Sequence, residues 1–249
     1  MYFWKYWRDT RTQFVGSFIV LPALCVFFTV IAVKVGDPDA MRKAAPPSSV
    51  IRAWSTTTEI VVGGWASIFT LIWGLVLGAA SLGEEFKEKT ADFLLVRPRD
   101  RSYWAWMGWL AGVCELSVMV VAAVGATFAT LIYLTGRVQT WLPLATILPL
   151  ALGGAVAYGL TYFIVLVARN GRQGLSYGIG LLFIDLPLPA AVYYYWHVNF
   201  PSVLGFMMSA CKWCGGAPGA FPGGSLVLWT AIALAFPFAA QLLLERAEV

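Results

Sequence analysis

Two cysteines three positions apart, Cys211 and Cys214, are the most closely spaced reactive side chains in this 249-residue sequence. A C-x-x-C pair can close a small disulfide, bind a metal or exchange electrons with a partner. A tetrahedral metal site needs two further ligands, and no nearby pair supplies them. A redox relay needs a second cysteine pair, whereas Cys25 and Cys114 stand apart in apolar sequence. All three interpretations stay open, and an oxidising compartment outside the membrane favours the disulfide.

Two carboxylic acids interrupt long apolar stretches. Asp185 is followed by Pro187 and Pro189, and Glu115 lies among mostly apolar residues. An ionised carboxylate at the centre of a bilayer costs about 2.5–3.5 kcal/mol, so each group should face protein or water, or be protonated. Each one therefore either lines a polar route for a substrate or bonds a neighbouring helix. The prolines predict a kink or break in the helix that carries Asp185.

The apolar stretches that hold these residues set the class of protein. The chain is 59% hydrophobic and 12% charged, well outside ordinary soluble usage. About 20 helical residues cross the hydrocarbon core of a bilayer, and backbone amides in lipid have no water to bond. We predict an all-α, polytopic membrane protein with one transmembrane domain over residues 1–249. Its six crossing helices are expected at 14–33, 60–82, 104–134, 142–168, 174–196 and 225–244.

Lys and Arg near the ends of these helices predict the orientation, because they resist translocation. The segments on the N-terminal side hold eleven of the 17 basic residues, which places both termini in the cytoplasm of a plasma or inner membrane. Residues 1–13 mix aromatic and basic side chains, as in a helix that lies on the inner membrane face. The alternative is that they extend the first crossing helix. With the basic residues distributed by membrane topology, nucleic acid is not an expected partner.

Three pairs of glycines have the G-x-x-x-G spacing that lets helix backbones approach closely. They indicate contacts either within the bundle or between two copies of the chain. The pairs are Gly74 and Gly78, Gly108 and Gly112, and Gly174 and Gly178.

Residues 83–101, between the second and third crossing helices, have a distinct pattern. Charged residues come first and an aliphatic cluster follows before Pro98. This order predicts a short amphipathic helix beneath the membrane that docks a soluble partner. The alternative is a solvated loop with ordinary positive-inside charges.

The same segment resembles a stretch of the ABC-2 type permeases, the membrane subunits of a class of ATP-binding-cassette exporters. That stretch reads E-x-x-x-G-T-x-x-x-L-L-x-x-P-x-x-R, with Lys89 here in place of the glycine. The layout is also similar: an amphipathic basic N-terminus, six crossings and this loop between the second and third. The matching residues are Glu85, Thr90, Leu94, Leu95, Pro98 and Arg101.

The resemblance implies a coupling helix that fits a groove on a separate ATPase subunit, with ATP and Mg bound on that subunit and no cofactor in this chain. Two copies of the chain, or this chain with a related one, would enclose the route. Residues 197–224 would form an outer loop with a surface or re-entrant helix. The coupling candidates are Glu84, Glu85, Lys87, Glu88, Phe93, Leu94, Arg169 and Arg172.

The expected function is therefore ATP-driven export across the membrane. No G-x-x-x-x-G-K-[ST] motif occurs, so the ATPase would be a separate chain and this chain not itself an enzyme. One alternative is a mechanical transmitter that acts on an extracytoplasmic partner. A membrane redox enzyme using the C-x-x-C pair and an ion-coupled carrier are weaker alternatives, since catalytic motifs and internal repeats are missing from the sequence. His197, the single histidine, is expected to be structural.

Overall fold

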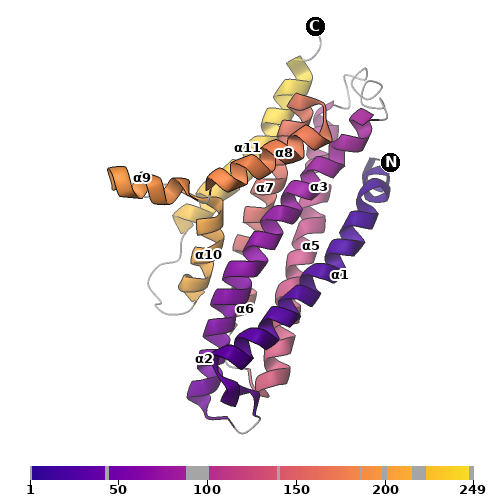
Figure 1. Cartoon of the computed structure of the whole chain (residues 1–249). Helices are drawn as coiled ribbons and strands as arrows, with labels where there is room; N and C mark the ends of the chain where they lie inside the picture. Colours follow the sequence, from indigo (N-terminus) through magenta and orange to yellow (C-terminus); the bar gives the residue numbers. More distant parts are fainter. Residues whose placement is uncertain are drawn as a thin grey trace.

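The computed structural model describes residues 2–42, 45–87, 101–138, 141–185, 187–197, 201–214 and 223–246. Every element in these ranges is a helix, so the all-α prediction is confirmed. The long helices run roughly side by side as an elongated bundle (Figure 1). They are α1 (Tyr2–Gly36), α2 (Pro47–Thr57), the π-helix η2 (Thr58–Ala66), α3 (Ser67–Lys87), α5 (Arg101–Thr135), α7 (Ile147–Ala168) and α11 (Gly223–Arg246). The shorter ones are the 3₁₀ helix η1 (Pro38–Met41), α6 (Leu142–Ala145), α8 (Gly171–Asp185), α9 (Leu188–Trp196) and α10 (Val203–Cys214).

Five helical stretches are long and apolar enough to cross a membrane, at Phe14–Gly36, Pro47–Ser81, Ser102–Thr135, Pro143–Ala168 and Gly223–Arg246. They correspond to the first four predicted crossings and the last one, so the chain is a multi-pass membrane protein. Hydroxyl groups on these helices often donate to a carbonyl one turn earlier in the same helix. Thr29 donates to the Cys25 oxygen at 2.6 Å, and Thr161 to the Ala157 oxygen at 3.1 Å. Such bonds satisfy a hydroxyl where no water is at hand.

The remaining predicted crossing, 174–196, is not one continuous helix. It is divided into α8, of 15 residues, and α9, of nine, and neither has the length to cross the hydrocarbon core. The break falls between Asp185 and Leu188, where the prolines predicted it. Proline lacks an N–H and disfavours helical geometry in the residue before it. Beyond the break, α9 points away from the bundle (Figure 1).

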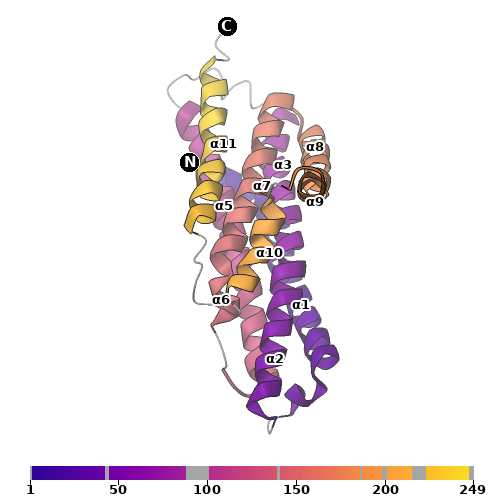
Figure 2. The same cartoon turned by 90° about the vertical axis from the view of Figure 1, so that its left-hand side faces the viewer.

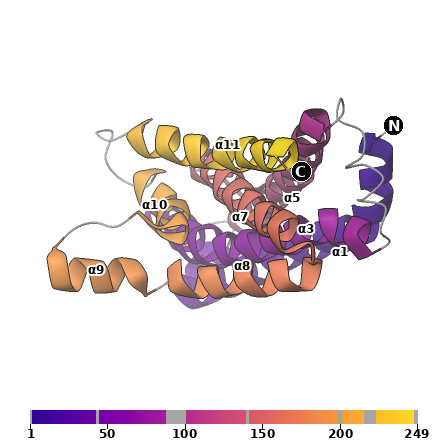
Figure 3. The ribbon, with the colours of Figure 1, turned by 90° about the horizontal axis from the view of Figure 1, so that it is seen from above.

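Helix α7 lies at the centre of the bundle. Both Figure 2 and Figure 3 place it between α11 on one side and α8 on the other. All three G-x-x-x-G pairs turn out to pack against it. A Cβ atom added at Gly74 would lie 2.8 Å from the Gly154 carbonyl oxygen, and one at Gly78 2.6 Å from that of Tyr158. These pairs therefore serve contacts within the chain.

The other two pairs make room for side chains of α7. A Cβ at Gly112, on α5, would overlap the Tyr158 ring, and one at Gly174, on α8, would overlap Val165. The Tyr158 hydroxyl then donates to the Gly108 oxygen at 2.9 Å. The hydroxyl of Tyr162, one turn along, donates to the Ala105 oxygen at 3.2 Å. Because each bond reaches a backbone carbonyl, α5 and α7 are fixed in register.

Both ends of the described chain, at Tyr2 and Arg246, lie toward one end of the bundle, which we call the terminal end (Figure 1). The end of α3, the start of α5 and the turn between α7 and α8 lie there too. The opposite, or distal, end holds η1, α2 and α6. Helix α1 is unbroken from Tyr2 onward, so residues 2–13 extend the first crossing helix. Whether they also rest on the membrane face stays a prediction.

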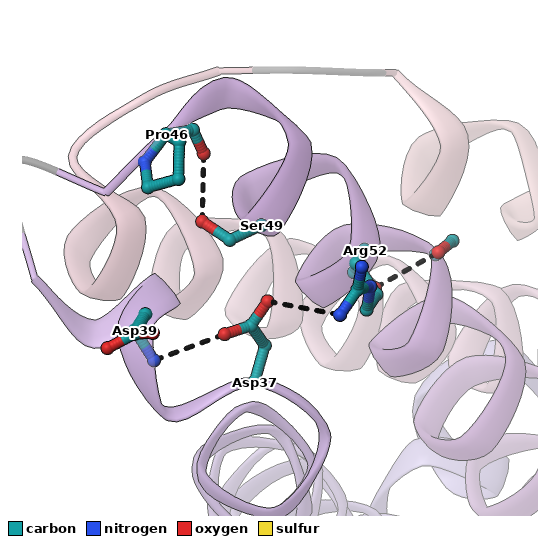
Figure 4. Close-up of polar contacts among 6 residues, drawn as sticks. Asp37, Asp39, Pro46, Ser49 and Arg52 are labelled. Atoms are coloured by element: carbon teal, nitrogen blue, oxygen red, sulfur yellow. Dashed lines mark hydrogen bonds and ion pairs between the residues drawn. The ribbon is translucent and has the colours of Figure 1, made fainter.

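The distal end has a small apolar core of its own, which we call the distal cap. It comprises Val33, Ala45, Val50, Ala53, Trp54 and Leu131. The fully buried Trp54 donates through Nε1 to the Thr135 hydroxyl at 3.3 Å and stacks edge-on to Phe128. Asp37 closes the cap: its carboxylate accepts from the Asp39 amide at 3.1 Å and lies 4.0 Å from Arg52 Nη1 (Figure 4).

Candidate functional site

The predicted coupling residues that the structure describes fall at the terminal end of the bundle. Glu84, Glu85 and Lys87 lie on the last turns of α3, where the backbone is described and the side chains are not. Glu88, Phe93 and Leu94 lie outside the described residues, as does the segment predicted to form the amphipathic helix. The docking helix therefore stays a prediction. The structure does show where the predicted docking helix would start, which is the end of α3, the helix that packs most extensively on α7.

The two arginines of the coupling set lie on a tight turn between α7 and α8. Arg169 adopts a left-handed backbone conformation, with φ of 52°, which ends α7. Asn170 then begins α8, because its Oδ1 accepts from the Arg172 amide at 2.9 Å and from the Gln173 amide at 3.4 Å. Arg169 and Arg172 are exposed. This capped turn presents two cations on the same end of the molecule as the end of α3.

A backbone contact joins this charged end to the middle of the bundle. Helix α3 packs along α7 backbone to backbone through Gly74 and Gly78, whereas Gly174 and Gly178 of α8 pack against the Val165 and Thr161 side chains of α7. Helix–helix contacts without intervening side chains leave little room for one helix to slide on the other. The close contact therefore fixes the position of α3 on α7.

Asp185 bonds a neighbouring helix, which was one of the two alternatives for it. Its Oδ2 accepts from the Ser202 hydroxyl at 2.9 Å and from the Leu204 amide at 3.1 Å. Its Oδ1 accepts from the Val203 amide at 3.3 Å. Ser202 also caps α10, since its hydroxyl oxygen accepts from the Gly205 amide at 3.0 Å. The carboxylate thus lies at the positive end of the α10 dipole, where a negative charge is stabilised.

Glu115 lies in a different part of the molecule. It is 7% exposed, on α5, in the core beside Leu116. Helices α3 and α7 lie between α5 and α8 (Figure 3), so Glu115 and Asp185 do not share a site. The sequence placed both on one candidate route. The structure gives Asp185 a structural bond and leaves a route through either residue as a prediction.

His197 ends α9. Its backbone is left-handed, with φ of 53°, and its amide donates to the Tyr193 oxygen at 2.9 Å. Its ring meets the Tyr193 ring edge-on at 6.1 Å. These contacts agree with the structural role expected for it. Among the described residues, no three His, Cys, Asp or Glu side chains gather into a metal-binding group.

The cysteine pair falls within α10, so the backbone between Cys211 and Cys214 is helical. Their side chains lie outside the described residues, and the disulfide stays a prediction. The other two cysteines carry free thiols, with Cys25 buried in α1 and Cys114 exposed on α5. Helix α10 runs beside η2 and α7, in the region expected to form a surface or re-entrant helix.

Sequence reasoning missed two features of the structure. One is the partner of Asp185: Ser202 followed by an apolar run is an N-cap signal that could have been recognised. The other is the distal cap, for which Asp37 before a proline was the available signal. Neither a scan of known family models nor a search of curated proteins finds a match to this chain.

Proposed function

We propose that the chain is the permease subunit of an ATP-binding-cassette exporter, set in a plasma or inner membrane with both termini in the cytoplasm. A separate ATPase subunit, holding ATP and Mg, would dock at the terminal end. Two copies of the chain, or this chain and a related one, would enclose the substrate route. The sixth membrane segment would be the broken stretch of helices α8, α9 and α10 taken together.

The observation that carries the proposal is the backbone contact between α3 and α7. The docking segment begins where α3 ends, and Gly74 and Gly78 press α3 against the α7 backbone. ATP-driven closure of two ATPase subunits would push on the end of α3. The close contact would pass that push to the central helix, and so to the rest of the bundle. The exposed Arg169 and Arg172 give the ATPase a second point of contact by charge.

Charge reversal tests the docking end. We expect Glu84→Lys with Glu85→Lys to abolish co-purification with an ATPase encoded beside this chain. Asp39→Lys is the matched control, because Asp39 is exposed at the distal end and reversal there should leave binding intact. If the wild-type chain never associates with such an ATPase, or if the reversed chain binds and transports normally, the proposal is wrong.

The distal cap supports a second candidate, a mechanical transmitter. The helical run from α2 through η2 to α3 joins the cap to the docking end without a gap. A π-helix within such a run is often found at functional sites, and its hydrogen bonds join residues five apart, one more than in an α-helix. Work delivered at α3 could therefore reach a partner outside the membrane. ATPase activity that rises only when an extracytoplasmic protein is added would favour this candidate over export.

A further inference from the structure

A nine-residue π-helix lies in the middle of an otherwise α-helical column. It is η2, Thr58–Ala66, and the column runs without a gap from α2 through η2 into α3 (Figure 1). The Ser67 hydroxyl at its end donates to the Val62 oxygen at 3.3 Å, five residues earlier. The Thr58 hydroxyl at its start donates to the Trp54 oxygen at 2.8 Å, only four residues earlier. Most π-helical segments are single turns within α-helices, and they are frequent at functional sites.

The column is fixed on both sides of η2. Toward the terminal end, Gly74 and Gly78 hold α3 against the α7 backbone, where an added Cβ would lie 2.8 and 2.6 Å from carbonyl oxygens. Toward the distal end, the fully buried Trp54 donates to the Thr135 hydroxyl of α5 at 3.3 Å. Helix α5 is in turn bonded to α7 through the Tyr158 hydroxyl. Both ends of the column are therefore tied to the same central helix, and η2 lies between the two ties.

The π-helix holds a residue that the two ties do not need. Each of its hydrogen bonds closes around one residue more than a bond of an α-helix. Removal of one residue would therefore restore α-helical bonding and leave α2 and α3 in place. Gly64 is the residue best suited to removal. The nearest atom to a Cβ built on it is the Glu59 oxygen, at 3.9 Å, and glycine is a poor helix former.

The junction of α2 and η2 also leaves a polar atom unsatisfied. Thr57 is fully buried, and its hydroxyl has no hydrogen-bond partner among the described residues. A buried hydroxyl without a partner costs stability, because it has lost its water and gained nothing in exchange. A rearrangement that gives Thr57 a partner would recover this cost. The π form is thus not favoured by every group at the junction.

We propose that η2 is a joint between the distal cap and the rest of the bundle, which changes between π-helical and α-helical bonding. In the π form, which the structure shows, both ties of the column are made at once. In the α form, the same residues take a different twist, so α2 turns relative to α3. The bond of Trp54 to Thr135 then breaks, since the backbone contacts of α3 contain no side chain that could adjust. Helices α1 and α10 lie beside η2 and would follow the change.

Deletion of Gly64 tests whether η2 holds a surplus residue. It should leave the midpoint of thermal unfolding in detergent unchanged or raise it by about 2–4 °C, because a glycine leaves the interior of a helix. Deletion of Gly125 is the matched control. Gly125 is an equally open glycine on α5, which is tied to Tyr158 and to Trp54 but is α-helical throughout.

In α5 no π-helix absorbs the loss. Deletion of Gly125 turns the far end of the helix by about 100° and should lower the midpoint by about 10 °C or more. An equal fall in the two deletions overturns the proposal, because η2 would then hold no surplus residue.

A pair of spin labels measures the movement of the cap. The labels are placed at Ile51→Cys on α2 and Leu148→Cys on α7, both exposed, in a chain whose native cysteines are replaced by alanine. With η2 intact, the distances should be broadly distributed or show two maxima, and deletion of Gly64 should leave one narrow maximum. The control pair, Ile72→Cys on α3 and Val167→Cys on α7, does not cross η2 and should be narrow in both chains. If the first pair is as narrow as the control pair with η2 intact, the joint does not exist.

Hydrogen exchange in the unmodified chain gives a test that needs no variant. Amides of residues 61–65 should exchange at least about tenfold faster than those of residues 70–74, further along the same column, because a joint opens more often than the helix beside it. Equal rates would overturn the proposal. None of these measurements uses an ATPase, so the joint and the exporter proposal can fail independently.

Discussion

Gly78 and Tyr158 meet backbone to backbone, so that a Cβ atom at position 78 would lie 2.6 Å from the Tyr158 carbonyl oxygen. Real Cβ atoms do not approach a carbonyl so closely, and the contact therefore requires glycine. This one contact joins the helix that leads to the predicted docking segment with the helix at the centre of the bundle. It is also the contact on which the proposed transmission of movement depends.

Gly78→Ala should therefore separate α3 from α7. We expect a loss of about 1–3 kcal/mol in the free energy of unfolding, the usual cost of overpacking a close contact. Thermal unfolding in detergent would measure it. Gly125→Ala is the matched control, since nothing lies within 4 Å of a Cβ added there and alanine is the better helix former. Equal stability of the two variants would contradict the close contact.

Removal of a single hydroxyl tests the register of α5 against α7. Tyr158→Phe keeps the ring but loses the bond to the Gly108 oxygen. We expect the free energy of unfolding to fall by about 1 kcal/mol, as for other hydrogen bonds between membrane helices. Tyr133→Phe should have no effect, because Tyr133 is 84% exposed. A neutral result at Tyr158 would mean that the bond contributes nothing to the register.

Asp185→Ala should loosen the start of α10. The variant loses all three bonds to Ser202, Val203 and Leu204, whereas Asp185→Asn keeps one acceptor oxygen and should have a smaller effect. Hydrogen exchange at the amides of residues 203–206 would report the change, and we expect faster exchange in the order wild type, Asn, Ala. Unchanged exchange in the alanine variant would show that Asp185 does not hold α10.

The same variants bear on the substrate route. If Asp185 only ties α10 to α8, Asp185→Asn that still folds should transport at close to the wild-type rate. Glu115→Gln is the companion variant, because Glu115 is buried on the opposite side of α7. Loss of transport in a variant with normal exchange and normal assembly would restore that residue to the route.

The distal cap should depend on its tryptophan and hardly at all on its ion pair. Trp54→Ala removes a fully buried ring and should cost about 3–5 kcal/mol. Arg52→Ala should cost less than about 1 kcal/mol, because the Arg52 side chain is 69% exposed and its contact with Asp37 is long. Limited proteolysis of the distal end in sealed membranes would compare them. Equal resistance of the two variants would contradict this ranking.

Five crossing helices could be predicted from the sequence because lipid leaves an apolar chain few choices. Every backbone amide must be paired within the helix, so a long apolar run specifies both a helix and its location in the membrane. The break after Asp185 was also predictable, since Pro187 acts on its immediate neighbours. The direction of α9 beyond it was not, because that direction depends on the bonds from Asp185 to a segment 17 residues later.

The glycine pairs illustrate the same limit. The G-x-x-x-G spacing identified Gly74 and Gly78 as a close-contact surface, and it identified the glycine pairs on α5 and α8 in the same way. It did not say that all three face α7, because spacing defines one helix surface and carries no information on its partner. Tyr158 and Tyr162 would have been read as lipid-facing or route-facing aromatics, and only the folded chain shows them bonded to α5.

The stretch from Pro47 to Ser81 is 35 residues long, or about 52 Å as a helix. Even a steep inclination of about 40° leaves its projection near 40 Å, against a hydrocarbon slab of about 30 Å. Some of this column must therefore rise beyond the lipid, and it carries η1 and the tryptophan-centred cluster with it. The described helices thus offer water-borne molecules a folded surface beyond the lipid.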